Sequence, residues 1–230
     1  MKRSEINGII RESLSFFAQH GFMLPPFCRI GPGEWERQAD RLGEVAAAGL
    51  GWDITDFGLG EFKKTGILLV TLRNGGTEAT RSMRKTYCEK IIHLRVDQTC
   101  PMHYHKAKTE DIINRGGGRL SFELYLAGAD GRSFSEDRFE VFRDGMRHSC
   151  RPGEVVRLAP GESLTIPPFL YHSFWAEQED VLAGEVSTVN DDTADNFFSQ
   201  DMPRFMAIEE DEEPEYLLVH EVGRSVKKQE

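Results

Sequence analysis

Pro101-Met102-His103-Tyr104-His105, followed by Glu110 and by Asn114-Arg115-Gly116-Gly117-Gly118, is the stretch that decides the fold. In an extended chain the side chains of residues i and i+2 lie on the same side, so His103 and His105 can reach one point. We interpret the glycine run as a turn that folds the chain back and brings Glu110 to the same point. The segment therefore predicts a metal site on β-structure.

A third histidine, His172, follows Pro167-Pro168-Phe169-Leu170-Tyr171 and is expected on a later strand. With His103, His105 and Glu110 it would give a divalent ion three imidazoles and one carboxylate. Such a set leaves coordination positions open, which is typical of a catalytic metal site and not of a structural one. Nitrogen and oxygen ligands suit first-row ions. We expect one divalent metal ion, Mn first, with Zn, Co, Ni or Fe as alternatives.

The spacing of these residues resembles the two motifs of the cupin superfamily. The first motif reads HxH, four residues, Glu, six residues and Gly, and the second reads Gly, five residues, Pro and then His. The residues that match are His103, His105, Glu110 and Gly117 in the first motif, and Gly161, Pro167 and His172 in the second. The resemblance implies an all-β-dominated fold, the cupin double-stranded β-helix or jelly-roll barrel, here with N-terminal helices.

The chain departs from the cupin motifs at three positions. Asp97 and Phe169 stand where the motifs usually have glycine, and Ala176 replaces the asparagine that closes the second motif. These positions serve turn geometry, so the departures concern loop details more than metal binding.

Periodicity supports the same fold class. A cap at Ser4 and apolar residues at helical spacing predict a helix over residues 4–20, and good helix formers predict a second over Glu34–Ala48. From Gly66 onward, short β-branched and aromatic runs alternate with turn residues, which predicts a sandwich or barrel. The expected strands are Gly66–Arg73, Tyr87–Val96, Leu120–Ala127, Arg138–Phe142, Glu154–Leu158, Ser163–Ile166, Tyr171–Trp175, Val181–Val186 and, last, Tyr216–Val222.

The chain shows no internal repeat and no low-complexity linker, and 230 residues suit one domain. We expect a single cupin domain over residues 1–230. Within it, residues 1–60 would form a mainly helical extension, residues 61–190 the β-barrel core, and residues 191–230 a C-terminal extension.

Composition restricts the partners. The formal net charge of -10 disfavours nucleic acid and anionic lipid, which need clustered cations. No apolar run is long enough to cross a bilayer, and nothing near Met1 resembles a signal peptide. The four cysteines have no CxxC spacing and are interpreted as reduced thiols. We expect a cytoplasmic protein with a small-molecule partner, no nucleic acid and no membrane.

Longer segments resemble bacterial D-lyxose isomerases, and the resemblance covers nearly the whole chain. They are Leu24–Phe27, Gly51–Gly58, Lys106–Gly118 and Glu185–Asn196, of which the run Glu-Asp-Ile-Ile-Asn-Arg-Gly-Gly-Gly at 110–118 is the most specific. The resemblance implies a metal-dependent conversion of D-lyxose to D-xylulose, with D-mannose to D-fructose as a second activity. Cupins frequently pair, so a homodimer is expected.

Proton transfer between C2 and C1 of an aldose needs a base beside the metal. Glu185 interrupts an apolar strand and is the preferred candidate for the base, while Lys90 and Lys108 could bind sugar oxygens. Carboxylates of the 191–195 run, and Glu210 of the later acidic run, are candidates for a second proton-handling group. We predict an enediol route over a hydride shift.

Three other functions use the same ligand set. A cupin oxygenase could hold iron in it, a non-catalytic cupin could use it only to sense a sugar, and a sugar-phosphate isomerase would need a cationic pocket. Lys90, Lys108 and Arg115 are the cations that such a pocket could use.

Overall fold

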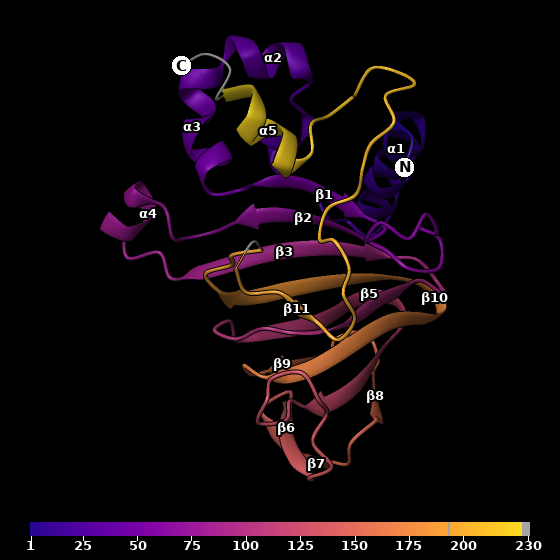
Figure 1. The fold of residues 1–230 in the computed structure, drawn as a ribbon. Coiled ribbons are helices and arrows are strands. Elements are labelled where there is room, and N and C mark those ends of the chain that lie inside the picture. Colours follow the sequence, from indigo (N-terminus) through magenta and orange to yellow (C-terminus); the bar gives the residue numbers. More distant parts are fainter. Residues whose placement is uncertain (193, 227–230) are drawn as a thin grey trace.

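The computed structural model describes residues 1–192 and 194–226, and its main feature is one curved antiparallel β-sheet (Figure 1). Residue 193 and residues 227–230 of the expected C-terminal extension lie outside the described residues. The strands are β1 (Gly51–Thr55), β2 (Ile67–Arg73), β3 (Tyr87–Leu94), β4 (Thr99–Tyr104), β5 (Glu110–Leu126), β6 (Phe139–Arg143), β7 (Met146–Cys150), β8 (Glu154–Leu158), β9 (Ser163–Ile166), β10 (Leu170–Thr188) and β11 (Phe197–Phe198). The helices are α1 (Arg3–Gln19), the 3₁₀ turn η1 (Pro26–Arg29), α2 (Pro32–Arg37), α3 (Ala39–Ala47), α4 (Glu78–Ser82) and α5 (Val219–Val226).

The two longest strands, β5 and β10, pair with each other in the middle of the sheet, whose main path is β1-β2-β3-β10-β5-β9-β6-β7. The first half of β10 also pairs with β4, and its second half pairs with β3. The expected strands Tyr171–Trp175 and Val181–Val186 are therefore one strand, interrupted by a bulge between Glu177 and Val181. This arrangement brings β3, β4 and β5 around one strand, and the site is built there.

The interpretation of Gly116–Gly118 as a turn is wrong, because β5 continues through these residues. They instead allow the bulged part of β10 to lie against β5. A Cβ atom on Gly117, which has φ +90°, would lie 2.0 Å from the carbonyl oxygen of Asp180, and one on Gly118 would lie 2.2 Å from that of Glu177. The glycines are needed for close approach of two backbones.

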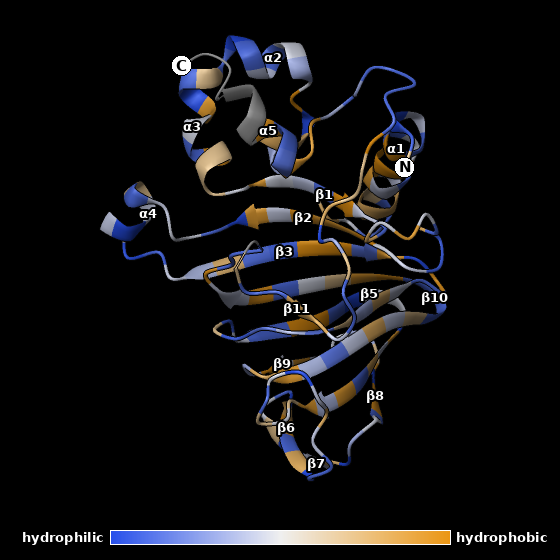
Figure 2. Cartoon of the chain, in the orientation of Figure 1, coloured by the Kyte–Doolittle hydropathy of each residue, from blue (hydrophilic) through white to orange (hydrophobic). Residues whose placement is uncertain are grey.

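Strands β2 and β3 contain many hydrophobic residues (Figure 2), and their apolar side chains are divided between two buried clusters, one on each face of the sheet. Leu69 and Ile92 point into the barrel core, whereas Leu68 and Ile91 pack with the apolar face of α1 on the outside. Because successive strand residues point to opposite faces, this continuous burial follows from helices covering the outer face. Helices α2, α3 and α5 gather beside β1 at the top of Figure 1.

Two predicted elements differ from the structure. The expected helix Glu34–Ala48 is divided into α2 and α3 at Gln38, which leaves helical geometry at φ −114° and ψ 18°. The expected last strand, Tyr216–Val222, is wrong: α5 begins at Val219, and the Glu221 carboxylate accepts the backbone N–H of Leu218 ahead of it. That carboxylate also pairs with Arg3 of α1. The contacts of Glu221 with Leu218 and Arg3 therefore stabilise helix α5 at a place where the apolar residues of the sequence predicted a strand.

The two positions at which the chain departs from the motif glycines do adopt a glycine-like backbone. Asp97 has φ 61° and Phe169 has φ 62°. This left-handed conformation is costly for a residue with a Cβ atom. The turn geometry of the motifs is thus kept although the glycines are absent.

Candidate active site

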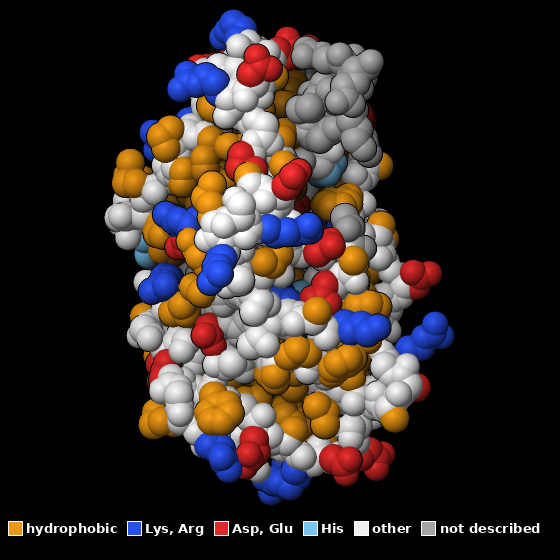
Figure 3. Space-filling model, turned by 90° about the vertical axis from the view of Figure 1, so that its left-hand side faces the viewer, with side chains coloured by type: hydrophobic (Ala, Val, Ile, Leu, Met, Phe, Trp, Pro, Cys, Tyr) orange, Lys and Arg blue, Asp and Glu red, His pale blue; other side chains and the backbone are white. Residues whose placement is uncertain are grey.

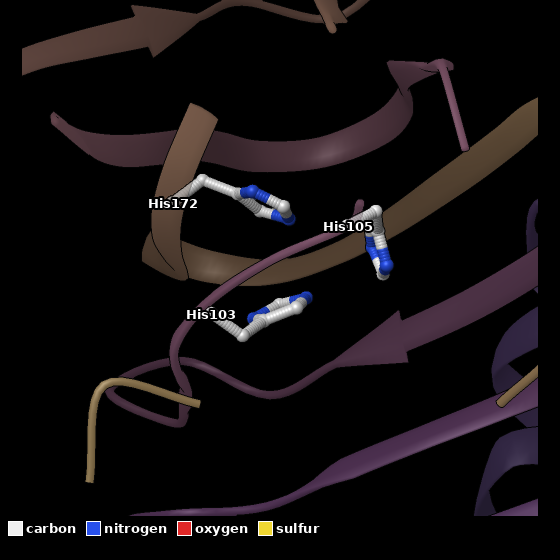
Figure 4. A group of neighbouring side chains, drawn as sticks. All are labelled: His103, His105 and His172. Carbon is white, nitrogen blue, oxygen red and sulfur yellow. The ribbon is translucent and has the colours of Figure 1, made fainter. Parts of the chain in front are cut away.

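Three histidines meet inside the barrel (Figure 4). His103 lies in β4 and is paired with His172 of β10, and His105 follows directly after β4. Their rings point toward one space, and one ring nitrogen of each lies within 4.8 Å of those of the other two. All three side chains are buried. The predicted gathering of the three histidines is confirmed.

The backbone fixes which nitrogen of each ring faces the shared space. The Nδ1 atoms lie 2.7 Å from the Pro101 carbonyl oxygen for His103, 2.9 Å from that of Asp195 for His105, and 3.0 Å from that of Leu170 for His172. A carbonyl can only accept, so each Nδ1 carries a proton and each Nε2 is the atom that faces the shared space. Burial, and next the neighbouring His172 and His105, lowers the pKa of His103 well below its ordinary value. This is the neutral form that a metal requires.

Glu110, at the start of β5, borders the histidines. Its Oε1 atom lies 3.2 Å from His172 Nε2 and 3.5 Å from His105 Nε2, and its Oε2 atom lies 2.6 Å from the Lys108 ammonium. Burial would raise the pKa of Glu110, but Lys108 and the histidines outweigh it and hold the pKa well below its usual range. The carboxylate is therefore ionised beside the histidines.

A chain of buried charges continues from Glu110. Lys108 Nζ lies 2.9 Å from Glu185 Oε1 of β10, and Lys90 Nζ of β3 lies 3.3 Å from the same oxygen. Burial lowers the pKa of Lys90, but Glu185 and Asp192 more than compensate, so its pKa is raised. Three of the four residues proposed for catalysis thus lie together next to the histidines.

Residues after β10 complete this group. Asp192 Oδ1 lies 3.9 Å from Lys90 Nζ, and its Oδ2 lies 3.6 Å from Arg204 Nη2. Arg204 also forms an ion pair with Asp53 of β1, which is 1% exposed. The cations, first of all Lys90, outweigh burial and lower the pKa of Asp192. The segment after β10 therefore supplies charged groups to the site.

One pocket is lined by most of these residues, but not by His172 or Asp53. Its charged lining residues are Lys90, Lys108, Glu110, Glu185, Asp192 and Arg204, and His103, His105 and Asn196 also line it. Its apolar lining residues include Phe57, Ile67, Leu69, Ile92, Ile112, Phe174 and Phe198. Figure 3 is turned toward the side of the molecule where α4 lies, and there acidic and basic side chains lie close together in the middle of the face. A pocket lined by both charged and apolar side chains suits a small polyol with a carbon backbone.

The donor set fits a divalent cation. His172 Nε2 is buried and makes no well-oriented hydrogen bond, although buried polar atoms normally have a partner. Within the ion-paired group, the four carboxylates of Glu110, Glu185, Asp192 and Asp53 outnumber the three cations Lys90, Lys108 and Arg204. A metal ion would give the orphaned nitrogen a partner and balance the excess negative charge. The histidine group can thus hold a metal.

Glu210 is one predicted site residue that the structure does not bring to this group, and Asp195 is another, because its carboxylate accepts the backbone N–H groups of residues 106–108. The Glu210 side chain is 56% exposed and pairs with Arg3 at 2.7 Å, at the start of α1. Sequence reasoning missed Asp53 and Arg204. Asp53 lies within one of the family-like segments, Gly51–Gly58, and its position between apolar residues of a strand was an available signal. Nothing in the local pattern distinguishes Arg204 from a surface cation.

A second group of metal-ligand type, His148, Cys150 and Glu154, lies around the hairpin of β6 and β7. Only Cys150 is buried, and burial raises the pKa of its thiol to about 11. A metal needs the thiolate. The group inside the barrel is the better metal site.

A curved antiparallel barrel that holds three histidines and a glutamate in its interior defines a cupin-like protein, as expected from the motifs. In the described residues, no helix has the length and apolarity needed to cross a membrane. The L-ribose isomerase of Geodermatophilus obscurus has a similar fold, with a TM-score of 0.57 and 17% identity over 91% of this chain and 98% of that one.

Sequence comparison identifies the family. The D-lyxose isomerase family profile matches residues 1–222. The D-lyxose/D-mannose isomerase of Serratia proteamaculans is 48% identical over 98% of this chain and 100% of its own length. The D-lyxose/D-mannose isomerase of Escherichia coli O157:H7 is 47% identical over 96% of this chain and 98% of its own length. The chain belongs to the D-lyxose isomerase family.

Proposed function

We propose that this protein is a metal-dependent aldose–ketose isomerase that interconverts D-lyxose with D-xylulose and D-mannose with D-fructose. The observation that carries the proposal is one pocket lined by His103 and His105 of the buried histidine group, by a carboxylate, Glu185, and by an ammonium, Lys108. Both curated relatives of about half identity are D-lyxose/D-mannose isomerases. We propose D-lyxose and D-mannose as substrates of this chain because these two relatives are named for them.

Isomerisation moves a proton from C2 of the aldose to C1, while negative charge develops on the carbonyl oxygen. A divalent ion, when bound, supplies a Lewis acid for that oxygen. We propose His103, His105, His172 and Glu110 as its ligands and Mn as the ion, with Zn, Co, Ni or Fe as alternatives. The gathering of the three buried imidazoles, the lowered pKa of His103 and the ionised Glu110 support this assignment.

Glu185 is proposed as the base that removes and returns the proton. It lies at the pocket wall, and its Oε1 atom accepts from Lys108 at 2.9 Å, so the carboxylate is held in one orientation. Lys108 is proposed to donate a hydrogen bond to O1 as charge develops there, and the O2 hydroxyl proton passes to O1 as the carbonyl forms at C2. This division of roles supports proton transfer through an enediol over a hydride shift.

Arg204 and Asp192 are proposed to bind hydroxyl groups of the sugar. Arg204 lines the pocket and is held by Asp53 on the side of β1. A guanidinium with fixed orientation can donate to two vicinal hydroxyls, and a carboxylate can accept from one. Phe57 and Phe198, whose rings lie 5.4 Å apart, would contact the carbon backbone.

The test is to remove metal with a chelator, restore single ions, and measure ketose formed from D-lyxose and D-mannose. We expect ketose only after an ion is restored; a protein loaded with each of the five ions that forms none would contradict the proposal. Reaction in heavy water should place deuterium in the product, whereas its complete absence would favour the hydride shift. The phosphorylated sugars serve as comparison substrates.

We also propose a homodimer in a reducing, cytoplasmic compartment. The four cysteines are buried and unpaired in the structure, which fits a compartment where thiols stay reduced. Light scattering coupled to size-exclusion chromatography would give the mass of two 26.1 kDa chains if the dimer forms, and of one if it does not.

A further inference from the structure

Asn74 follows the last residue of β2 and lies outside the lining of the active-site pocket. Its side chain is buried and binds the backbone of Asn190 in both directions. Its Nδ2 donates to the Asn190 carbonyl at 3.0 Å, and its Oδ1 accepts the Asn190 N–H at 3.0 Å. Nδ2 also donates to the carbonyl of Ala48 at 3.2 Å. The amide thus joins β2, the end of α3 and the segment after β10.

These hydrogen bonds hold the backbone of Asn190, and the side chain of Asn190 contacts both lysines of the site. Its Oδ1 atom accepts from Lys90 Nζ at 2.8 Å and from Lys108 Nζ at 3.4 Å. The same two ammonium groups hold Glu185 Oε1. A shift of Asn190 would therefore change the position of both lysines relative to the carboxylate.

We propose that Asn74 is a positioning residue of the active site, which acts through Asn190 on the Lys90–Glu185–Lys108 group. The inference rests on the proposed function, because it assigns Glu185 and Lys108 their roles. A bidentate amide contact fixes both the location and the rotation of one peptide unit, which a single hydrogen bond does not do. Asn190 lies two residues beyond the end of β10, and among the described residues no helix or strand follows until β11, so the local conformation at Asn190 depends on such contacts.

The first experiment compares wild type with Asn74→Ala, and uses Thr77→Ala as the matched control. Thr77 lies in the same loop, and its hydroxyl accepts the N–H of Thr80 and donates to Glu44, neither of which lines the active-site pocket. We expect Asn74→Ala to lower kcat by about tenfold or more, with KM changed by less than about twofold, since small misplacement of reacting groups costs rate. Thr77→Ala should lower the melting temperature and leave kcat unchanged.

The second experiment separates positioning from general destabilisation. Asn190→Ala keeps the backbone groups to which Asn74 is hydrogen-bonded, but it removes the Oδ1 atom that contacts Lys90 and Lys108. It should lower kcat by itself, and adding Asn74→Ala to it should then cost little further activity, since residues that act in one chain are not additive. Losses that multiply, or a normal kcat in Asn190→Ala, would overturn the inference. If Asn74→Ala does not fold, Asn74→Ser, which also loses the two-way contact with the Asn190 backbone, replaces it in both comparisons.

Failure of the inference is distinguishable from failure of the proposed function. Wild type that forms no ketose with any ion contradicts the function itself. Wild type that isomerises, with Asn74→Ala equal to it in kcat, contradicts only the role of Asn74. Metal content is measured for every variant, and it should be the same in Asn74→Ala as in wild type.

Discussion

Replacing Glu185 by glutamine removes the proposed base and changes little of its shape. The carbonyl of the new amide can still accept from Lys108, but the charge that two buried ammonium groups share is lost. Lys108 keeps Glu110 at 2.6 Å, and Lys90 keeps Asn190 at 2.8 Å. The stability cost should therefore stay at about 2 kcal/mol, as for a hydrogen bond to a charged group. Loss of a general base should lower kcat by about 10²- to 10⁴-fold, which corresponds to about 3–5 kcal/mol in the barrier.

The assay measures D-xylulose formed from D-lyxose at saturating substrate, with metal content and urea unfolding recorded on the same preparations. Glu123→Gln is the matched control, because Glu123 lies on β5, accepts from the Tyr125 hydroxyl and does not line the pocket. Its kcat should stay within about twofold of wild type. A Glu185→Gln protein with normal metal content and more than a tenth of the wild-type kcat would refute the assignment of the base.

Three further changes test other parts of the structure. Gly117→Ala should lower the unfolding free energy by more than about 3 kcal/mol in urea melts, because its Cβ would meet a backbone oxygen at 2.0 Å. Gly145→Ala, with φ +76° and no atom within 4 Å, should cost only about 1 kcal/mol, and equal costs would contradict the argument. Arg204→Lys should raise KM for D-lyxose by about tenfold with kcat nearly unchanged, since lysine lacks the planar fork; an unchanged KM would remove it from substrate binding. His93 is buried, and burial lowers its pKa below 6.5 despite the contact with Asp180, so the folded state binds its proton less readily than the unfolded chain does. Unfolding free energy should therefore fall as pH drops below about 6.5, and His93→Gln should flatten that slope.

The histidine group could be predicted because its information is local. HxH places two imidazoles on one side of a strand, and the second motif supplies His172, so the structure needed only to bring β4 and β10 together. Short runs of β-branched and aromatic residues between turn residues likewise predicted most strands of the barrel. These features depend on side-chain period and spacing, which a sequence displays directly.

The features that sequence reasoning missed depend on contacts between distant segments. The glycines at 116–118 look like a turn, and only the approach of the β10 bulge explains them. The end of the chain looked like a strand, whereas the contact of Glu221 with Arg3 accompanies a helix. Arg204 becomes a site residue only because the segment after β10 reaches Asp53 on β1.

The acidic residues show the same limit. Asp192 and Glu210 both belong to charge runs that resemble solvated surface. The structure places Asp192 against Lys90 in the pocket and Glu210 against Arg3 at the surface. Composition cannot separate the two, because their difference lies in which cation each one meets after folding.

The most direct test of the central claim measures bound metal and D-lyxose isomerisation together in wild type and His103→Ala. Wild type should bind one divalent ion per chain, lose activity when a chelator removes it, and regain activity when it is restored. His103→Ala should lose both the ion and the activity while it keeps the β-sheet signature in circular dichroism. Full activity in the chelated wild type, or in His103→Ala without bound metal, would contradict the account.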